Sequence, residues 1–349
     1  MKNINTIQIV DSLAEITRHH DREIIEKSLL KTLSDLNNSQ EFRLYKIIRT
    51  KPTITIGLLA FSINGSVEIA RRHTKEHVIP NSLKKNIEAA IRLGNIEQVS
   101  NTEGKTTHYI YPAFDHNNEV FSILIQDCNE NHNYNDLRLV HSLLKVYSNY
   151  LELIEYNKRD KLTQLLNRET LDNEITRLLI NNNEKNRHGV RRVKDPIGFW
   201  LGIIDIDHFK SVNDKYGHLF GDEVLILVAR QMKSDIRGDE DLIYRYGGEE
   251  FVILLQAKEM NEALVAFNRL RKNVAKQELP QLGHITISIG VVQVTDQPSS
   301  IKVIGNADQA LYYAKQHGRN QVCIYEKLIE DGSIEYKDDN IETREIEFF

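Results

Sequence analysis

Short apolar segments alternate with helical patterns through the second half of the chain, and this alternation limits the fold more than any other feature. Four apolar stretches have the composition of strands or of a hairpin: residues 197–206, 242–255, 284–292 and 321–325. Four stretches between them have helical patterns: residues 209–216, 222–235, 259–278 and 307–317. Strands of this kind pair into a sheet that amphipathic helices cover. We therefore predict an α+β domain with one sheet flanked by helices.

The chain is long enough for two domains. Its 349 residues exceed the roughly 100–200 that one domain usually holds. The net charge of -5 argues against a surface that coats nucleic acid, since such a surface is basic. No apolar run approaches the roughly 20 residues that span a bilayer, and residues 1–10 lack the features of a signal peptide. We therefore predict a cytoplasmic protein without nucleic-acid or membrane partners.

The first half of the chain is predicted to be a separate α+β domain, residues 1–134. A helical pattern over residues 21–36 precedes two pairs of strand-like segments. The pairs are residues 53–63 with 66–70, and residues 106–114 with 119–126. The first pair is joined by Asn64 and Gly65, which favour a tight hairpin because both tolerate positive φ. The order helix, hairpin, intervening helices, hairpin, helix describes an α+β domain that ends near residue 133.

Residues 135–158 carry a repeat in which apolar side chains recur at spacings of three and four. The repeat consists of Leu137, Val140, Leu144, Tyr147, Leu151 and Ile154. This spacing fits a coiled coil, and it also fits a single amphipathic helix packed on its own domain. The position between two domains favours the first alternative. We therefore predict a connector helix through which two chains form a homodimer.

A strand that ends in carboxylates provides the first candidate site. The apolar residues 198–204 lead into Asp205, Ile206 and Asp207. Acids at the carboxyl end of a buried strand lie where α/β folds usually bind ligands, so Asp205 is a site candidate. Asp207 is closer to the next helix, and for that residue a helix N-cap is the simpler interpretation.

A glycine turn followed by two acids provides the second. Gly247 and Gly248 separate two apolar segments, and Glu249 and Glu250 follow directly. Glycines leave the backbone bare for close approach to a phosphate chain. Paired acids suit Mg²⁺, which binds through one or two carboxylates together with nucleotide phosphates. A solvated turn would explain this motif if it stood alone.

With these motifs in place, residues 159–328 resemble the GGDEF family of diguanylate cyclases. The glycine turn has the Gly-Gly-Glu-Glu-Phe form of the family motif. Four further stretches are similar to the family's opening, nucleotide-binding and closing motifs: residues 160–168, 209–214, 217–222, and 288–290 with 314–320. The resemblance implies a mostly antiparallel sheet flanked by helices, as in nucleotidyl cyclases. It also implies synthesis of cyclic di-GMP from two molecules of GTP.

The resemblance further assigns roles position by position. Asp205, the carbonyl of Ile206 and Glu249 would hold two Mg²⁺ or Mn²⁺ ions. Glu250 would help to activate the attacking 3′-hydroxyl or complete the metal site, and Glu249 and Glu250 would be the catalytic residues. The GTP-binding residues would be Phe209, Lys210, Asn213, Asp222, Gly247, Gly248, Lys315 and Arg319. Within this set Asn213 and Asp222 would read guanine, since a carboxylate accepts from the N1 and N2 donors and an amide pairs with acceptors. Taken singly, Asn213 and Asp222 also fit turn or capping positions, and Lys315 and Arg319 fit a solvated helix end.

One departure from the family concerns product inhibition. Many members carry an Arg-x-x-Asp site just before the glycine turn. Here Asp241 keeps the acid while Gly238 stands at the arginine position, and Arg237 lies one residue early. We therefore expect this site to be degenerate and feedback through it to be weak or absent.

The remaining predictions concern residues outside the family match and alternative functions. Residues 1–134 resemble a GAF-type sensor by pattern and position, with a PAS-like domain as the competing interpretation and an unidentified small molecule as a possible ligand.

His73 to His77 match a His-x-x-Glu-His zinc motif, for which a solvated helix is the better explanation. Residues 329–349 form an acidic tail. The alternative to a cyclase is an inactive domain that binds GTP or cyclic di-GMP; another purine dinucleotide is a third possibility, which Asp222 disfavours.

Overall fold

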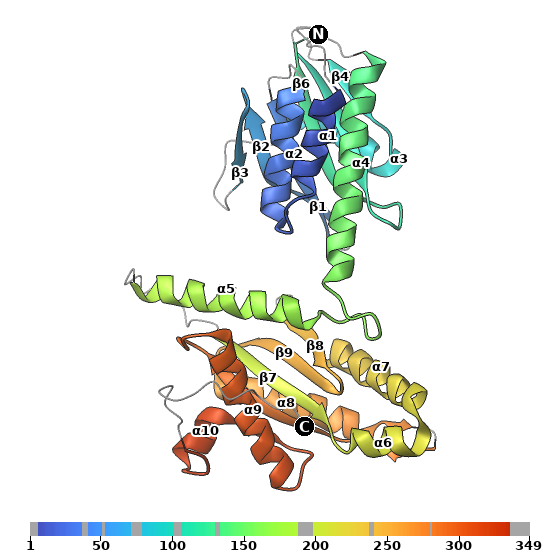
Figure 1. Ribbon diagram of the computed structural model, residues 1–349. Coiled ribbons are helices and arrows are strands. Elements are labelled where there is room, and N and C mark those ends of the chain that lie inside the picture. Colours follow the sequence, from blue (N-terminus) through green and yellow to red (C-terminus); the bar gives the residue numbers. More distant parts are fainter. Residues whose placement is uncertain are drawn as a thin grey trace. The chain divides into compact units, whose positions relative to one another are not determined.

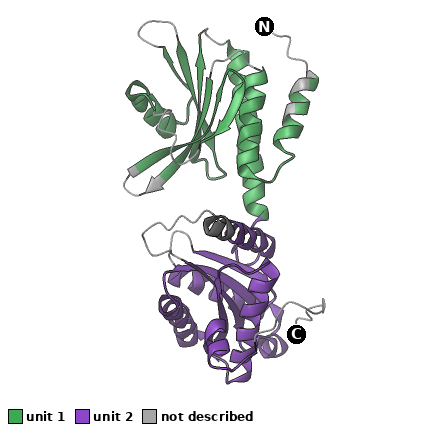
Figure 2. Cartoon of the chain, turned by 90° about the vertical axis from the view of Figure 1, so that its left-hand side faces the viewer, with its two compact units in different colours: residues 1–157 green, residues 158–349 purple. Residues whose placement is uncertain are grey.

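The computed structural model describes residues 6–36, 41–50, 53–70, 79–100, 106–129, 133–187, 198–236, 241–279 and 281–335. The chain divides into two compact units, Met1–Asn157 (unit 1) and Lys158–Phe349 (unit 2), which Figure 2 shows in green and purple. Each unit has its own hydrophobic core. His73, His77 and Gly238 lie outside the described residues, and so does the zinc-like motif. Among the described residues, no helix has the length and apolar character that crossing a membrane requires.

Unit 1 is an antiparallel sheet between helices (Figure 1). Its helical elements are α1 (Thr6–Ile16), α2 (Arg22–Leu36), η1 (Asn81–Leu83), α3 (Lys84–Leu93) and α4 (Tyr134–Asn157). Its strands are β1 (Glu41–Thr50), β2 (Thr53–Ile63), β3 (Ser66–Ile69), β4 (Glu97–Ser100), β5 (Thr107–Phe114) and β6 (Val120–Cys128). The strand order is β3-β2-β1-β6-β5-β4. Both expected hairpins are present, as β2–β3 and β5–β6, with Asn64 and Gly65 at φ 49 and 82.

The centre of this sheet is a strand that the sequence pattern did not predict. β1 pairs with β2 on one side and with β6 on the other. It contains Arg43, Lys46 and Arg49 among its apolar residues, which obscures the strand signal. The Arg43 side chain is nevertheless buried and ion-paired with Asp127, whose Oδ1 also lies 2.7 Å from His108 Nδ1. Tertiary packing, rather than local propensity, therefore decides the central strand.

The side chains expected to form a dimer seam on α4 are part of the core of unit 1. Val140, Leu144 and Tyr147 are at most 1% exposed, and Leu151 and Ile154 are 7% exposed. They pack with residues of α2 and β5 on one face of the sheet. The prediction that these positions meet a second chain was wrong, because their side chains are buried within unit 1. The repeat instead fits the alternative interpretation, an amphipathic helix that covers its own domain.

Unit 2 contains a five-stranded sheet covered on both faces. Its helices are α5 (Arg168–Arg187), α6 (Phe209–Tyr216), α7 (His218–Asp235), α8 (Met260–Lys276), α9 (Ser300–Gln316) and α10 (Tyr325–Glu330). Its sheet strands are β7 (Gly198–Ile206), β8 (Leu242–Gly247), β9 (Glu250–Ala257), β12 (Ile287–Val294) and β13 (Val322–Ile324), and a separate two-stranded ribbon joins β10 (Glu278–Leu279) to β11 (Gly283–His284). The order is β13-β12-β7-β9-β8, and only β12 and β13 run parallel, so the predicted mostly antiparallel sheet is confirmed.

The two faces of this sheet bury different sets of side chains. Helices α6, α7 and α8 contribute to one core, and α5, α9 and α10 contribute to the other. At Gly290 of β12 the backbone of α9 comes so close that a Cβ would lie 2.2 Å from both Ala307 O and Leu311 N. Glycine is therefore required for α9 to lie directly on the sheet.

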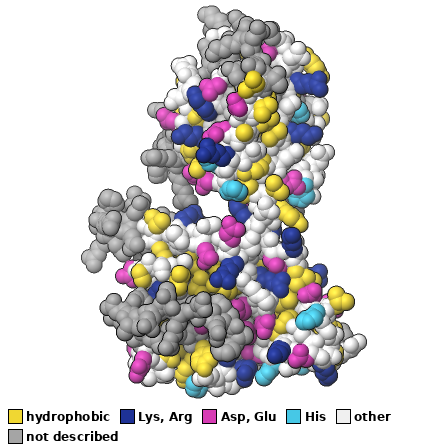
Figure 3. All heavy atoms as spheres, viewed as in Figure 1, with side chains coloured by type: hydrophobic (Ala, Val, Ile, Leu, Met, Phe, Trp, Pro, Cys, Tyr) yellow, Lys and Arg dark blue, Asp and Glu magenta, His cyan; other side chains and the backbone are white. Residues whose placement is uncertain are grey.

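The tail differs from the expectation at its beginning. Residues 325–330 form α10, Leu328 is buried, and Ile329 and Ile334 pack against the core that α9 covers. The acidic tail therefore begins later than residue 329, because apolar side chains in this stretch still reach the core. Figure 3 shows acidic and basic side chains interspersed over the visible face.

Candidate functional site

The acids predicted for the site lie on two adjacent strands of unit 2. Asp205, at the end of β7, is paired in register with Glu250, the first residue of β9. Residues alternate between faces along a strand, so Asp205 shares a face with Leu201 and Ile203, and Glu250 shares it with Val252 and Leu254. All four apolar residues belong to the core beneath α9. The carboxylates of Asp205 and Glu250 thus meet at one end of the α9 face, with Glu249 in the adjoining turn.

Burial and mutual repulsion raise the pKa values of these acids. The pKa of Asp205 rises to about 6, chiefly through burial, with opposition from Lys315 and further repulsion from Glu249 and Asp207. The pKa of Glu250 rises to about 7, again chiefly through burial and then through repulsion by Asp205. Lys315 Nζ, from α9, lies 2.9 Å from Asp205 Oδ2. The site therefore gathers more negative charge than one lysine balances.

A fourth acid near the site was not predicted. Asp308 lies on α9 seven residues before Lys315, and its charge raises the pKa of Glu250. Burial raises its own pKa, which Lys315 opposes. The spacing of seven puts both side chains on the same helix face, and that spacing is the sequence signal that could have revealed Asp308.

The glycine turn is fastened to the beginning of unit 2. Arg245, on β8, donates from Nη2 to Gly248 O at 2.9 Å and from Nη1 to Asp160 Oδ1 at 3.1 Å. The backbones of Arg245 and Leu166 are also bonded, at 2.8 Å. Gly248 has φ 49, and a Cβ on either Gly247 or Gly248 would meet no atom within 4 Å. The turn is thus fixed in conformation and open above its glycines.

The residues predicted to read guanine lie on α6 and α7, where these helices meet. Gly217 ends α6 and precedes α7 with φ 85, and its N–H donates to Asn213 O at 2.8 Å. A Cβ at Gly221 would lie 2.0 Å from Asn213 Oδ1, so glycine makes room for the Asn213 side chain beside Asp222. Asn213 and Asp222 are both half-buried. These helices cover the face opposite α9, and α6 begins three residues after β7 ends.

The predicted phosphate-binding residues differ in their surroundings. Lys210 is exposed on α6, whereas Phe209 beside it is 5% exposed and belongs to the core. Lys315 is engaged with Asp205. Arg319 follows α9 in a left-handed conformation, φ 58. Within the described residues, Lys315 is the member of this group that forms an ion pair with one of the acids, Asp205.

The donor set suits a hard divalent cation completed by substrate. Within the described part of the chain, no three His, Cys, Asp or Glu side chains form a ready-made metal cage. Asp205, Glu249 and Glu250 offer only carboxylate oxygens. Burial, and then repulsion between neighbouring acids, raises the pKa values of Asp205 and Glu250. Mg²⁺ typically takes one or two protein carboxylates together with phosphates and waters. The residues present therefore fit such an ion.

Two further predictions can be placed. Asp207 does not cap α6, because His208 occupies the N-cap position without a side-chain cap bond. The Asp207 carboxylate instead accepts hydrogen bonds from Thr286, Ser288 and Asn320. At the position where the sequence predicts a degenerate product-inhibition site, Asp241 Oδ1 accepts from Gln256 N at 2.9 Å.

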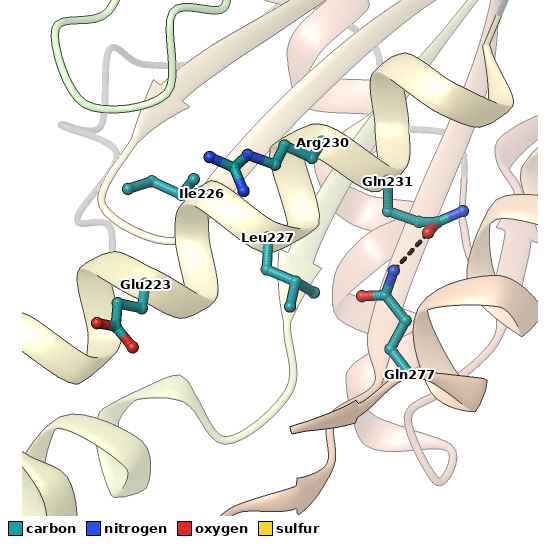
Figure 4. A pocket seen from close by; sticks show the side chains of 6 residues that line it. All are labelled: Glu223, Ile226, Leu227, Arg230, Gln231 and Gln277. Carbon is teal, nitrogen blue, oxygen red and sulfur yellow. Dashed lines mark hydrogen bonds between the residues drawn. The ribbon is translucent and has the colours of Figure 1, made fainter. Parts of the chain in front are cut away.

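A pocket of about 520 Å³ lies elsewhere on unit 2 (Figure 4). It is lined by Glu223, Ile226, Leu227, Arg230, Gln231 and Gln277. Five of these residues follow one side of α7, and Gln277 Nε2 donates a hydrogen bond to Gln231 Oε1 across it. None of the predicted site residues lines this pocket.

Comparison with known proteins identifies the segment that carries the site. Residues 157–321 match the family described as "Diguanylate cyclase, GGDEF domain". The chain is 39% identical over 182 residues to the diguanylate cyclase DgcZ of Escherichia coli K12, a match that covers 51% of this chain and 56% of DgcZ. It is 36% identical over 169 residues to the diguanylate cyclase VdcA of Vibrio cholerae, covering 47% of this chain and 45% of VdcA.

A solved structure is similar to about half of the chain. The coiled coil and GGDEF domain of DgcB from Caulobacter crescentus, in complex with c-di-GMP, is 28% identical with a TM-score of 0.46, covering 55% of this chain and 100% of that chain. The chain spans about half the length of DgcZ and VdcA. The family match, residues 157–321, falls almost entirely in unit 2 and assigns no family to unit 1.

Proposed function

We propose, from the premise that residues 157–321 are a GGDEF domain of the diguanylate cyclase family, that the chain condenses two molecules of GTP into cyclic di-GMP. The observation that carries the proposal is the pairing of Asp205 with Glu250 beside Glu249, on the face where Lys315 approaches. Acids of this kind on adjacent strands, next to an open glycine turn, suit a site for a metal-bound triphosphate.

Divalent cations, which GGDEF diguanylate cyclases generally use, would be held by Asp205, the Ile206 carbonyl, Glu249 and Glu250. Such ions supply charge stabilisation for the transferring phosphoryl group and its leaving group. We expect Mg²⁺ or Mn²⁺, two per site. Burial and mutual repulsion make the ionised forms of Asp205 and Glu250 unfavourable, and their pKa values are raised for this reason. A bound cation would offset this cost, so cation binding would stabilise these two acids more than it would stabilise exposed ones.

The chemical step is a displacement at phosphorus. The 3′-oxygen of one GTP forms a bond to the α-phosphorus of the other, the bond to the bridging oxygen breaks, and pyrophosphate leaves. The 3′-hydroxyl proton passes to the carboxylate of Glu250, which lies at the start of β9 and is paired in register with Asp205. Two such displacements close the ring and release two pyrophosphates.

Substrate recognition divides between the two sides of the site. Asn213 and Asp222 read the guanine edge, as the amide and carboxylate chemistry allows. Lys210, Lys315 and Arg319 neutralise the triphosphate, with Phe209 anchoring α6 and with Gly247 and Gly248 giving the phosphates access to the turn. When GTP and metal bind, Lys315 would exchange its contact with Asp205 for one with phosphate.

Each unit 2 holds one GTP, so the reaction needs two chains facing each other. We propose a homodimer, with unit 1 as a sensor of GAF-like type that controls how the two sites meet. The predicted seam of α4 is buried in unit 1, so contacts through this helix would use other side chains, such as Leu153 and Tyr156, which are 52% and 57% exposed. The activity is expected in the cytoplasm.

The test is a product assay on the purified full chain. Incubation with Mg²⁺ and GTP should yield a species with the mass of cyclic di-GMP together with pyrophosphate, while ATP should yield none. Asp205→Asn is the matched inactive control. Absence of a cyclic dinucleotide from folded, dimeric wild-type protein that still binds GTP would instead support the inactive GTP-binding domain.

A further inference from the structure

Asp207 is a buried acid next to the proposed site that the mechanism above does not use. It lies one residue beyond the end of β7 and is 6% exposed. Its Oδ2 accepts from Thr286 Oγ1 at 2.6 Å and from Asn320 N at 3.0 Å, and its Oδ1 accepts from Ser288 Oγ at 2.7 Å. Both oxygens are thus engaged by neutral donors within the chain. This arrangement does not suit a metal ligand, and it calls for another explanation.

The contact with Asn320 reaches a turn of unfavourable conformation. Gly318, Arg319 and Asn320 have φ values of 102, 58 and 44. Left-handed conformations are disfavoured for residues with a Cβ and persist only where surrounding contacts hold them. Here Asp207 binds the N–H of Asn320, and Arg271 Nη1, from α8, donates to Asn320 O at 2.9 Å and to Asn320 Oδ1 at 2.8 Å.

The turn contains Arg319, which the proposed function assigns to the triphosphate. Asp207 therefore links two parts of the site: the strand end that carries Asp205 and Ile206, and the turn that carries Arg319. It also ties this strand end to β12 through Ser288, the residue paired in register with Asp205. A shift of the turn would move the guanidinium of Arg319 relative to the acids.

We infer that Asp207 is a positioning residue: through Asn320 it holds Arg319 where the β- and γ-phosphates of GTP bind, and it thereby sets affinity for the triphosphate. This inference rests on the proposed function for the identity of the ligand. Asp207 itself touches neither substrate nor metal. It acts through hydrogen bonds that a neutral side chain of the same shape can largely replace.

The chemistry of asparagine makes the inference testable. In Asp207→Asn the amide oxygen can accept from Asn320 N and Thr286 Oγ1, while the amide nitrogen donates to Ser288 Oγ, whose hydroxyl can rotate to accept. Asp207→Ala removes all three contacts. A positioning role thus predicts that asparagine preserves function and alanine does not, whereas a metal-binding role predicts that both fail.

The experiment measures binding by titration calorimetry on the full chain with Mg²⁺, using GMP and a GTP analogue that has a methylene group between the α- and β-phosphates. Asp207→Ala should weaken binding of the analogue roughly 10-fold or more while GMP binding changes little. Asp207→Asn should stay within roughly 3-fold of wild type. In the Arg319→Ala background, adding Asp207→Ala should cause little further loss, because the contact through which Asp207 acts is already gone.

Several results would overturn the inference. These are unchanged analogue affinity in Asp207→Ala, equal loss in Asp207→Asn, or a full additional loss in the Arg319→Ala background. Should Asp207→Ala not fold, Arg271→Ala removes the other support of Asn320 from the surface of α8, and unchanged affinity for the analogue there would overturn it. If the wild-type protein binds neither nucleotide, both the proposed function and this inference are wrong. If the wild-type protein binds the analogue and the Asp207 variants bind it equally well, only this inference is wrong.

Discussion

Each unit buries a carboxylate beside a cation, and the two pairs differ in charge balance. In unit 1, Glu26 on α2 is 2% exposed and accepts from Arg22 Nε at 2.7 Å and from Tyr147 Oη, on α4, at 3.3 Å. In unit 2, Asp205 is 7% exposed and lies 2.9 Å from Lys315. The first acid pairs with one cation and accepts from one hydroxyl. The second shares its cation, because Lys315 also lowers the pKa values of Glu250 and Asp308.

Under the proposed function, this difference separates an acid with a structural role, Glu26, from one that binds a ligand, Asp205. The pair of Glu26 and Arg22 leaves no net charge for a ligand to neutralise. Glu26 also links α2 to α4 within the core of unit 1. Three acids around one lysine leave negative charge that a divalent cation can neutralise. Burial raises the pKa in both places, so a raised pKa alone does not distinguish the two kinds of site.

The largest expected effect concerns catalysis. Asp205→Asn should lower cyclic di-GMP synthesis at least about 100-fold, because it removes charge needed to stabilise the transition state. Glu26→Gln, the matched control in unit 1, should change the rate of the isolated chemical step little. Initial rates of pyrophosphate release at saturating GTP measure both. A comparable loss in the two variants, with both folded, would break the comparison.

The next effect concerns stability, and here the substitution of Glu26 should have a larger effect than the substitution of Asp205. Glu26→Ala should lower the free energy of unfolding of unit 1 by about 1–3 kcal/mol, because Arg22 and Tyr147 lose their buried acceptor. Asp205→Asn should leave unit 2 as stable or more stable, since it removes a repelled charge. Trp200 is the single tryptophan of the chain and lies in unit 2.

Urea unfolding can therefore separate the units. Tryptophan fluorescence follows unit 2 alone, whereas far-ultraviolet circular dichroism follows both units. Glu26→Ala should advance the dichroism transition and leave the fluorescence midpoint unchanged. A shift of the fluorescence midpoint by Glu26→Ala would show that the two units do not unfold independently.

A smaller effect should appear with pH and Mg²⁺. The folded pKa values of Asp205, about 6, and Glu250, about 7, lie above their ordinary values of 3.8 and 4.5. Between about pH 4 and 7 the folded state thus binds more protons than the unfolded state, and unit 2 loses stability as pH rises. Mg²⁺ should raise the fluorescence-detected melting temperature at pH 8 more than at pH 5, because the acids must be ionised to bind it. Equal stabilisation at both pH values would contradict this explanation.

The smallest effect is expected at Asp241, whose carboxylate accepts a hydrogen bond from the backbone N–H of Gln256. Asp241→Ala should cost about 1 kcal/mol, because the N–H of Gln256 loses its acceptor. It should not alter inhibition by cyclic di-GMP, since Gly238 stands where the family has arginine. Inhibition constants from rates at several GTP concentrations check this. Tight, non-competitive inhibition that Asp241→Ala abolishes would show that the site works without that arginine.

The sequence was most informative where function depends on local order. Glycines followed by acids, and acids at a strand end, predicted the β8–β9 turn and the end of β7, because one short segment carries each motif. Arg245 and Asp160 were not foreseen as partners, since they meet across 85 positions of the chain. The roles of Asp207 and Asp308 likewise depend on which helix packs on which strand. The repeat on α4 was ambiguous for a physical reason: spacings of three and four place side chains on one side of a helix, whichever surface then covers them.

Gly290 sets the spacing between α9 and β12 by backbone contact rather than by side-chain packing. Layers held apart by side chains can adjust when a core residue changes volume, but two backbones in contact have no such compliance. The distance of Lys315 and Asp308 from the sheet is therefore set by Gly290, a residue that has no side chain and no role in the proposed reaction. Substitutions elsewhere in this core can change the stability of the packing between α9 and the sheet. The position of Lys315 relative to Asp205 should change little, because the backbone contact at Gly290 fixes it.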